Sequence, residues 1–194
     1  MAAKPFEPER RRFLLQTASV LGAVGAGMAT APFLGYLRPG MQALEAADPI
    51  EIDVSKIAPR QLVRTEWMGR PIWILHRTEE MLRGLEEVET FLADPDSERS
   101  QQPESCKNRY RSIKPEFFVA VGLCTHLACS PTYRPEVAPP DLGPEWRGGF
   151  FCPCHGSRFD LAGRVFKNVP APVNLAVPPH HYRTETLLVI GEEA

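Results

Sequence analysis

The hydrophobic and polar positions divide the chain into one long apolar run followed by many short, mixed segments. Residues 13–37 contain no charged side chain over 25 positions, and roughly 20 helical residues suffice to cross the core of a bilayer. Lys4 and Arg10–Arg12 precede this run, which places the N-terminus in the cytoplasm. The pattern therefore predicts a single membrane-spanning anchor over residues 1–37, with the rest of the chain on the other side of the membrane.

The residues before the apolar run also resemble an export signal. The stretch "RRRFL" is similar to the twin-arginine signal, which a receptor reads as an address, and the resemblance implies export of a protein already folded around a cofactor. Ala29-Thr30-Ala31 has the small-x-small form of a cleavage site, but Pro32 follows it and the apolar run continues to Leu37. We therefore expect an uncleaved anchor, joined to the next domain by a tether over residues 38–49.

Beyond the tether, the pattern predicts a small antiparallel β domain over residues 50–194. Ile50, Ile52 and Val54 alternate with polar residues, as in a half-buried strand. The stretch "QLVRTEWMGRPIWILHR" predicts two strands around a turn at Met68-Gly69. Further short strands are expected in "EFFVAVGLC", "GRVFKN", "VNLAVP" and "RTETLLVI".

One segment of this domain changes period and predicts an inserted helix. Thr78 can cap its start and Pro95 follows its end. One helical face gathers the apolar residues of the segment, which are Met81, Leu82, Leu85, Val88, Phe91 and Leu92. The predicted fold class is thus mainly β: a single N-terminal transmembrane helix, then an antiparallel β domain with one inserted helix.

Composition narrows the class of function. The net charge is −2, which gives no electrostatic case for binding nucleic acid. The chain has 20 prolines, which suggests many loops and sheet edges. It also has five cysteines, an odd number, so they cannot all be paired within the chain.

Two short motifs carry the candidate metal chemistry. They are "CTHLACS" and "CPCHGS", and their first cysteines lie 28 positions apart. Each motif contains a C-x-H or C-x-x-H pair, and the cysteines left over are candidates for a disulfide in an oxidising compartment. The candidate residues are Cys124, His126, Cys129, Cys152, Cys154 and His155.

Together the two motifs resemble the Rieske [2Fe–2S] family, and the anchor and the later "VPAP" stretch make the likeness closest to the Rieske subunit of a bacterial cytochrome bc1 complex. In that family two cysteines hold one iron and two histidines hold the other. The resemblance implies that Cys124 and Cys152 are the thiolate ligands and His126 and His155 the imidazole ligands. It further implies a Cys129–Cys154 disulfide that ties the two loops together.

The resemblance assigns roles to further residues. Ser157 would donate a hydrogen bond to a cluster sulfur. Leu127 would lie at an exposed tip, where it shields the cluster and docks onto cytochrome b. Pro170 and Pro172 resemble the family's proline loop, which covers the cluster from a third side. The cluster-binding subdomain would then span about residues 120–172.

The implied function is electron transfer inside a membrane enzyme, a quinol–cytochrome c oxidoreductase. Replacing two thiolates by neutral imidazoles raises the reduction potential from roughly −400 mV into the range of roughly −150 to +300 mV. By resemblance, quinol at cytochrome b gives an electron to the cluster and a proton to His155, and cytochrome c1 receives the electron. The expected setting is a dimeric respiratory or photosynthetic bc1 complex in a bacterial inner membrane, with the Rieske domain in the periplasm.

The sequence departs from the family pattern at two positions. Phe159 stands where many members have tyrosine, which removes a hydroxyl donor near the cluster and predicts a somewhat lower potential. Ala128 stands where many members have glycine, which predicts that the backbone at this position is not strictly left-handed.

Three other classes of protein remain open at this point. A structural zinc site could use four of the Cys/His residues. A Rieske ferredoxin or oxygenase would lack the anchor or need a further iron site. The small Rieske subunit of another periplasmic oxidoreductase, of the arsenite oxidase type, can also carry a twin-arginine signal. Outside the motifs we expect Cys106 to be a buried or idle thiol, His76 to be structural, and His180 and His181 to form a solvated loop pair.

Overall fold

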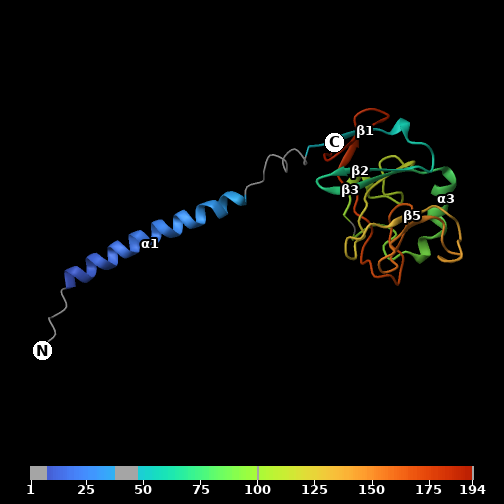
Figure 1. The fold of residues 1–194 in the computed structure, drawn as a ribbon. Coiled ribbons are helices and arrows are strands. Elements are labelled where there is room, and N and C mark those ends of the chain that lie inside the picture. Colours follow the sequence, from blue (N-terminus) through green and yellow to red (C-terminus); the bar gives the residue numbers. More distant parts are fainter. Residues whose placement is uncertain (1–7, 38–47, 100, 194) are drawn as a thin grey trace. The chain divides into compact units, whose positions relative to one another are not determined.

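The computed structural model describes residues 8–37, 48–99 and 101–193 (Figure 1). The chain separates into two compact units, Met1–Leu44 and Glu45–Ala194. In the first unit, helix α1 runs from Pro8 to Tyr36 and buries none of its side chains. Among the described residues it is the one helix long and apolar enough to cross a membrane, judged by length and composition. Most of the predicted tether, residues 38–47, lies outside the described residues.

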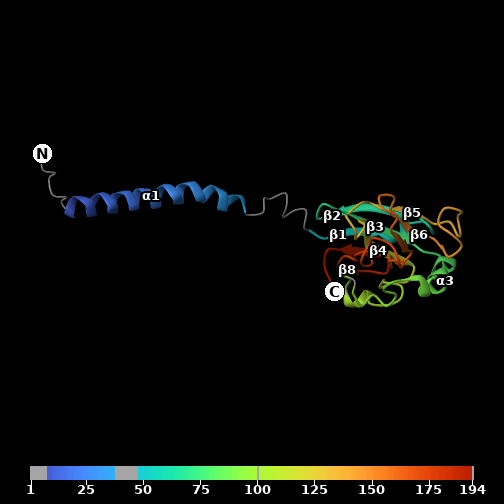
Figure 2. The same ribbon diagram turned by 90° about the horizontal axis from the view of Figure 1, so that it is seen from below.

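The second unit is built from three antiparallel sheets of three strands each (Figures 1 and 2). One sheet has the order β2-β3-β4, formed by β2 (Leu62–Trp67), β3 (Arg70–His76) and β4 (Phe117–Val121). The turn between β2 and β3 lies at Met68 and Gly69 as predicted, with φ of 52° and 69°. Two successive positive φ angles are typical of a tight hairpin whose twist matches the strands.

The second sheet has the order β1-β9-β8 and joins the two ends of the domain. It consists of β1 (Ile50–Asp53), β9 (Leu187–Ile190) and β8 (His180–Tyr182). The predicted first strand ends one residue early, because the Asp53 carboxylate accepts a hydrogen bond from the Ser55 N–H and starts a 3₁₀ turn over Val54–Lys56.

The third sheet, β5-β6-β7, carries the second cysteine motif. Its strands are β5 (Thr132–Arg134), β6 (Gly149–Phe151) and β7 (Arg158–Asp160). The pattern did not predict these strands, because three residues are too few to establish an alternation. Of the two segments expected as strands, 163–168 contains only the single bridges Leu92↔Phe166 and Phe159↔Val165, and 173–178 contains none. Prolines at both ends of the second segment remove backbone donors there.

The inserted helix is shorter than predicted. Helix α3 spans Glu79–Glu87, and the Thr78 hydroxyl caps it by accepting from the Met81 N–H. A 3₁₀ turn over Glu89–Phe91 follows, and Phe91 is 44% exposed rather than part of the buried face. The helix ends here because the next backbone groups bond elsewhere: the Ala93 N–H donates to Val165 O, and the Lys167 N–H donates to Phe91 O.

The hydrophobic core lies between these elements and reaches the cysteine motifs. The largest buried cluster includes Trp73, Phe118 and Phe150 together with Cys124 and Cys152. The fold class is therefore the predicted one, mainly β with one apolar N-terminal helix. The core also supplies a rigid base under both motifs.

Candidate metal centre

The two cysteine motifs form loops with the same backbone hydrogen bonds. In the first loop, which follows β4, the Cys124 N–H donates to Cys129 O at 2.7 Å and the Ala128 N–H donates to Cys124 O at 2.9 Å. In the second loop, which connects β6 and β7, the Cys152 N–H donates to Ser157 O at 2.8 Å and the Gly156 N–H donates to Cys152 O at 2.9 Å. Each loop thus folds its six residues back onto a leading cysteine.

The fifth residue of each loop must have a positive φ for this return. Gly156 has φ of 76° and Ala128 has φ of 60°. The prediction that Ala128 avoids the left-handed region is wrong. Because the shared hydrogen bonds demand the same path from both loops, alanine adopts it at a steric cost of roughly 1–2 kcal/mol.

The leading cysteines provide two buried thiols that face each other. Cys124 is 3% exposed and Cys152 is 2% exposed, and neither forms a disulfide. Burial raises the pKa of the Cys124 thiol, and its contact with Cys152 raises it further, while the His126 N–H and the Ser157 hydroxyl lower it. A metal would remove both thiol protons and balance the buried negative charge.

The two predicted imidazoles complete a mixed donor set. The rings of His126 and His155 meet edge to face, with centroids 4.8 Å apart. His126 is half-buried, whereas His155 is exposed. Two buried thiols and two adjacent imidazoles on separate loops match the ligand chemistry of a cluster whose irons take cysteine and histidine respectively. The residues present therefore fit a Rieske [2Fe–2S] centre.

Cys129 and Cys154 are joined by a disulfide, the pair that the resemblance implies. Their sulfur atoms and that of Cys152 lie within 4.8 Å of one another. That trio is not a metal site of its own, because two of its sulfurs are already bonded to each other. The disulfide instead fixes the first loop against the second.

A segment after β7 closes over the loops through two hydrogen bonds. The Ala171 N–H donates to the Ser157 hydroxyl oxygen at 3.1 Å, and the Thr125 hydroxyl donates to Val173 O at 2.6 Å. Pro170 is exposed in this segment, and Leu127 on the first loop is 68% exposed. The motif pattern did not single out Thr125, because a threonine between two ligands gives no signal until its partner is known.

The aromatic residues around Phe150 do not supply the hydroxyl that a tyrosine at position 159 would bring. Phe159 is fully buried in β7 and pairs with Phe150 in β6. Tyr133 packs on Phe150 with ring centroids 5.8 Å apart, but its hydroxyl donates to Arg60 O. The second loop itself provides one hydroxyl, that of Ser157, which accepts from the Ala171 N–H.

The cysteine and histidines outside the motifs lie in other parts of the domain. Cys106 is fully buried, as expected. His76 lies at the end of β3, and its Nδ1 is 2.6 Å from Ile57 O. The prediction that His180 and His181 form a solvated pair is wrong for His180: it is 2% exposed, because the segment that carries Cys106 lies against it.

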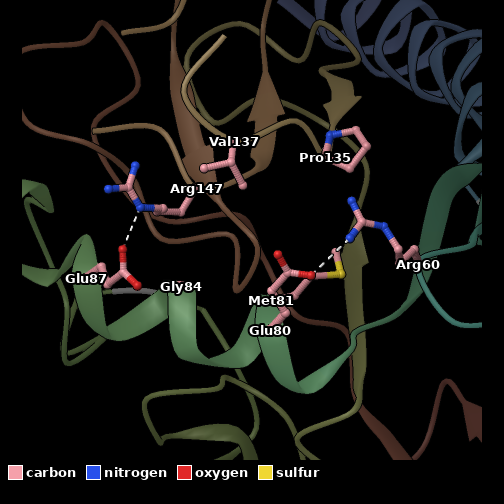
Figure 3. A pocket seen from close by; sticks show the side chains of 8 residues that line it. All are labelled: Arg60, Glu80, Met81, Gly84, Glu87, Pro135, Val137 and Arg147. Carbon is pink, nitrogen blue, oxygen red and sulfur yellow. Dashed lines mark hydrogen bonds and ion pairs between the residues drawn. The ribbon is translucent and has the colours of Figure 1, made fainter. Parts of the chain in front are cut away.

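A cleft between α3 and the 135–147 segment is separate from these loops (Figure 3). It encloses about 160 Å³. Two ion pairs border it, Arg60 with Glu80 and Arg147 with Glu87. None of the candidate ligands lines it, so it takes no part in the metal centre.

Comparison with known proteins agrees with the geometry of the loops. Residues 104–179 match the family model described as Rieske [2Fe-2S] domain, which defines the class of protein. Residues 1–40 match the model described as Ubiquitinol-cytochrome C reductase Fe-S subunit TAT signal. The cofactor of such a domain is a [2Fe–2S] cluster.

Relatives that match along the whole chain identify the family. The ubiquinol-cytochrome c reductase iron-sulfur subunit of Allochromatium vinosum is 55% identical over 193 residues, covering 100% of this chain and 93% of the relative. That of Blastochloris viridis is 39% identical, covering 95% and 94%. A chain of a solved hyperthermophilic respiratory Complex III is 25% identical, covering 94% and 99%, with a TM-score of 0.49. By the two sequence relatives, the chain belongs to the family of ubiquinol–cytochrome c reductase iron–sulfur subunits.

Proposed function

We propose that this chain carries electrons from quinol bound at cytochrome b to cytochrome c1, with the proton of the quinol passing through His155. As a member of this family it is a subunit of an oxidoreductase, the bc1 complex. The observation that carries the finer proposal is the exposure of His155, whose ring meets that of His126, while both thiols stay buried. One end of the centre is thus open to a partner and the other is closed to solvent.

In this proposal four residues hold the cluster. Cys124 and Cys152 bind one iron as thiolates, and His126 and His155 bind the other as imidazoles. When bound, the cluster supplies a one-electron couple at high potential. The Ser157 hydroxyl accepts from the Ala171 N–H and directs its own proton toward the thiol side of the site. Such a hydrogen bond to sulfur stabilises added negative charge and raises the potential.

The proton of the quinol is transferred at the exposed imidazole of His155. Its second nitrogen, in the deprotonated form, accepts a hydrogen bond from a quinol hydroxyl and then takes that proton while the electron leaves the quinol. Leu127 is exposed on the adjacent loop and makes the apolar contact with cytochrome b. The segment around Pro170, held by Ser157 and Thr125, limits the access of water.

The domain organisation in this proposal follows the division of the sequence. Residues 1–37 are the signal and anchor, residues 38–49 a tether, and residues 50–194 the Rieske domain, with its cluster-binding part at about 120–172. The domain lies on the periplasmic side of a bacterial inner membrane, and its swing on the tether moves the centre between cytochromes b and c1 in a dimeric complex. The positive charges before the anchor support the orientation.

The proposal is tested by docking variants in the intact complex. Leu127→Arg places a charge on the apolar tip, and we expect quinol–cytochrome c reductase activity to fall at least tenfold with the cluster content unchanged. Val137→Arg is the matched control, because Val137 is also an exposed apolar residue, at 56%, on a different loop. Equal activity of the two variants would refute the docking of this tip onto cytochrome b. So would purification of the wild-type chain from membranes without any accompanying cytochrome b and c1.

A further inference from the structure

A second pair of metal-binding side chains lies outside the two cluster loops. Cys106 and His180 are 0% and 2% exposed, and the Cys106 Sγ lies 3.8 Å from the His180 Nε2. Cys106 comes from the long segment between α3 and β4, and His180 begins β8, so the fold brings together residues 74 positions apart. Neither residue has a role in the electron-transfer site.

The histidine of this pair is oriented as a ligand. Its Nδ1 lies 2.9 Å from Pro178 O, which can only accept, so Nδ1 carries the proton. Nε2 therefore presents a lone pair to the thiol, which donates its S–H to it. Metal-binding histidines usually hold their second nitrogen in this way, by donating to a carbonyl.

The separation of the two donor atoms fits a tetrahedral metal. Zinc binds thiolate sulfur at about 2.3 Å and imidazole nitrogen at about 2.0–2.1 Å. With these bond lengths, the Sγ–Nε2 distance of 3.8 Å corresponds to an S–Zn–N angle of about 120°. That is near the tetrahedral value of about 109°, so the ion fits between the two side chains with little movement.

The surroundings supply space for water and an unused polar group. A pocket of about 460 Å³ lies against His180 and is also lined by Tyr182, Ser105, Ile113 and His181. No carboxylate among the described residues forms a three-ligand group with Cys106 and His180, so water would supply the remaining ligands of a cation held there. The Tyr182 hydroxyl oxygen is shielded from solvent and has no hydrogen-bond partner among the described residues. It can accept from or donate to a water molecule on the metal.

We propose that Cys106 and His180 form a binding site for a zinc-class divalent cation, whose remaining ligands are water molecules in the pocket that His180 lines. On binding, the S–H bond of Cys106 breaks, the Zn–S bond forms, and the proton leaves to solvent. Without the cation, the same pair remains joined by its S–H···N hydrogen bond. The cation links the segment before β4 to β8.

The test uses the full-length, cluster-loaded protein, with iron counted alongside zinc. Zinc is titrated against a competing chelator. We expect the wild type to bind one zinc per chain in addition to its iron, and Cys106→Ser and His180→Gln to bind it at least tenfold more weakly. His181→Gln is the matched control, because it removes a neighbouring imidazole of the same pocket and should bind as the wild type does.

A second readout does not depend on comparing affinities. X-ray absorption at the zinc edge should show one sulfur at about 2.3 Å in the wild type and none in Cys106→Ser. Absence of zinc from the wild type, or Cys106→Ser binding zinc within tenfold of it, would overturn the proposal. Zinc in place of iron at Cys124 and Cys152 would instead refute the cluster, and the iron count separates the two results.

Discussion

The two cysteine-motif loops have the same backbone hydrogen bonds but place their histidines at different positions. In both, the first residue is a buried cysteine whose N–H donates to the carbonyl oxygen of the sixth residue. In the first loop the third residue is the imidazole, half-buried His126, whereas in the second loop it is Cys154 of the disulfide. The second loop places its histidine, His155, one position later and exposed. A shift of one residue on the same turn thus separates a half-buried imidazole from an exposed one.

The largest expected effect comes from removing the buried thiol with which each loop begins. Cys124→Ala and Cys152→Ala should each abolish the cluster, because neither loop can supply another free thiol: Cys129 and Cys154 are bonded to each other. Iron per chain and visible absorption measure the loss. Cys106→Ala is the control with a free, buried cysteine elsewhere. Iron retained by either loop variant would show that the thiols do not bind it.

The next effect comes from separating the two loops. Cys129 and Cys154 are 25 positions apart, and a disulfide across such a span raises the free energy of unfolding by about 3 kcal/mol. Replacing both by alanine should lower the temperature at which the cluster absorbance is lost by about 6–12 °C. Reduction of the wild-type disulfide should give the same shift. An unchanged transition in both cases would mean that the loops hold each other without it.

Smaller changes in stability are expected from substitutions at the fifth residue of each loop, Gly156 and Ala128. Gly156→Ala introduces a Cβ at φ of 76° with no atom within 4 Å of it, so only the backbone penalty acts. We expect the free energy of unfolding to fall by about 1 kcal/mol. Ala128→Gly should act in the opposite direction by less than about 1 kcal/mol, because glycine relieves the strain but adds freedom to the unfolded chain. Thermal unfolding of both variants measures this, and shifts of the same sign would contradict a shared turn.

The smallest effect concerns the hydroxyls of the second loop and the strand after it. Ser157→Ala removes a hydrogen bond to sulfur and should lower the reduction potential by about 20–60 mV. Phe159→Tyr adds a hydroxyl and should raise it by a similar or smaller amount. Redox titration of the purified protein gives both values. A potential insensitive to Ser157 would remove its proposed role in tuning the centre.

The sequence predicted those parts of the fold that have a long pattern or a strong turn. The anchor has a long uncharged run, and the β2–β3 hairpin has Met68-Gly69 at its turn. Strands β5, β6 and β7 were not predicted, because each has three residues and pairs only in three dimensions. The end of α3 was placed too late, because the backbone after it bonds to residues 165–167, more than 70 positions away.

In the site, too, the features that depend on contacts between distant segments were not predicted. The candidate ligands and the disulfide could be named from motif spacing and resemblance, because those residue types are rare. The left-handed Ala128 was missed, because its conformation is imposed by the hydrogen bonds of the loop and not by its own preference. His180 was taken for a surface residue, because its burial depends on the segment that carries Cys106.

The most direct test of the central claim is an electron paramagnetic resonance spectrum of membranes that contain this protein, reduced with ascorbate. A rhombic signal with the low average g-value of mixed histidine and cysteine ligation is the predicted result. The signal should shift when an inhibitor of the quinol site on cytochrome b is added. A signal that appears only with dithionite, or none with either reductant, would contradict a high-potential Rieske centre in this chain.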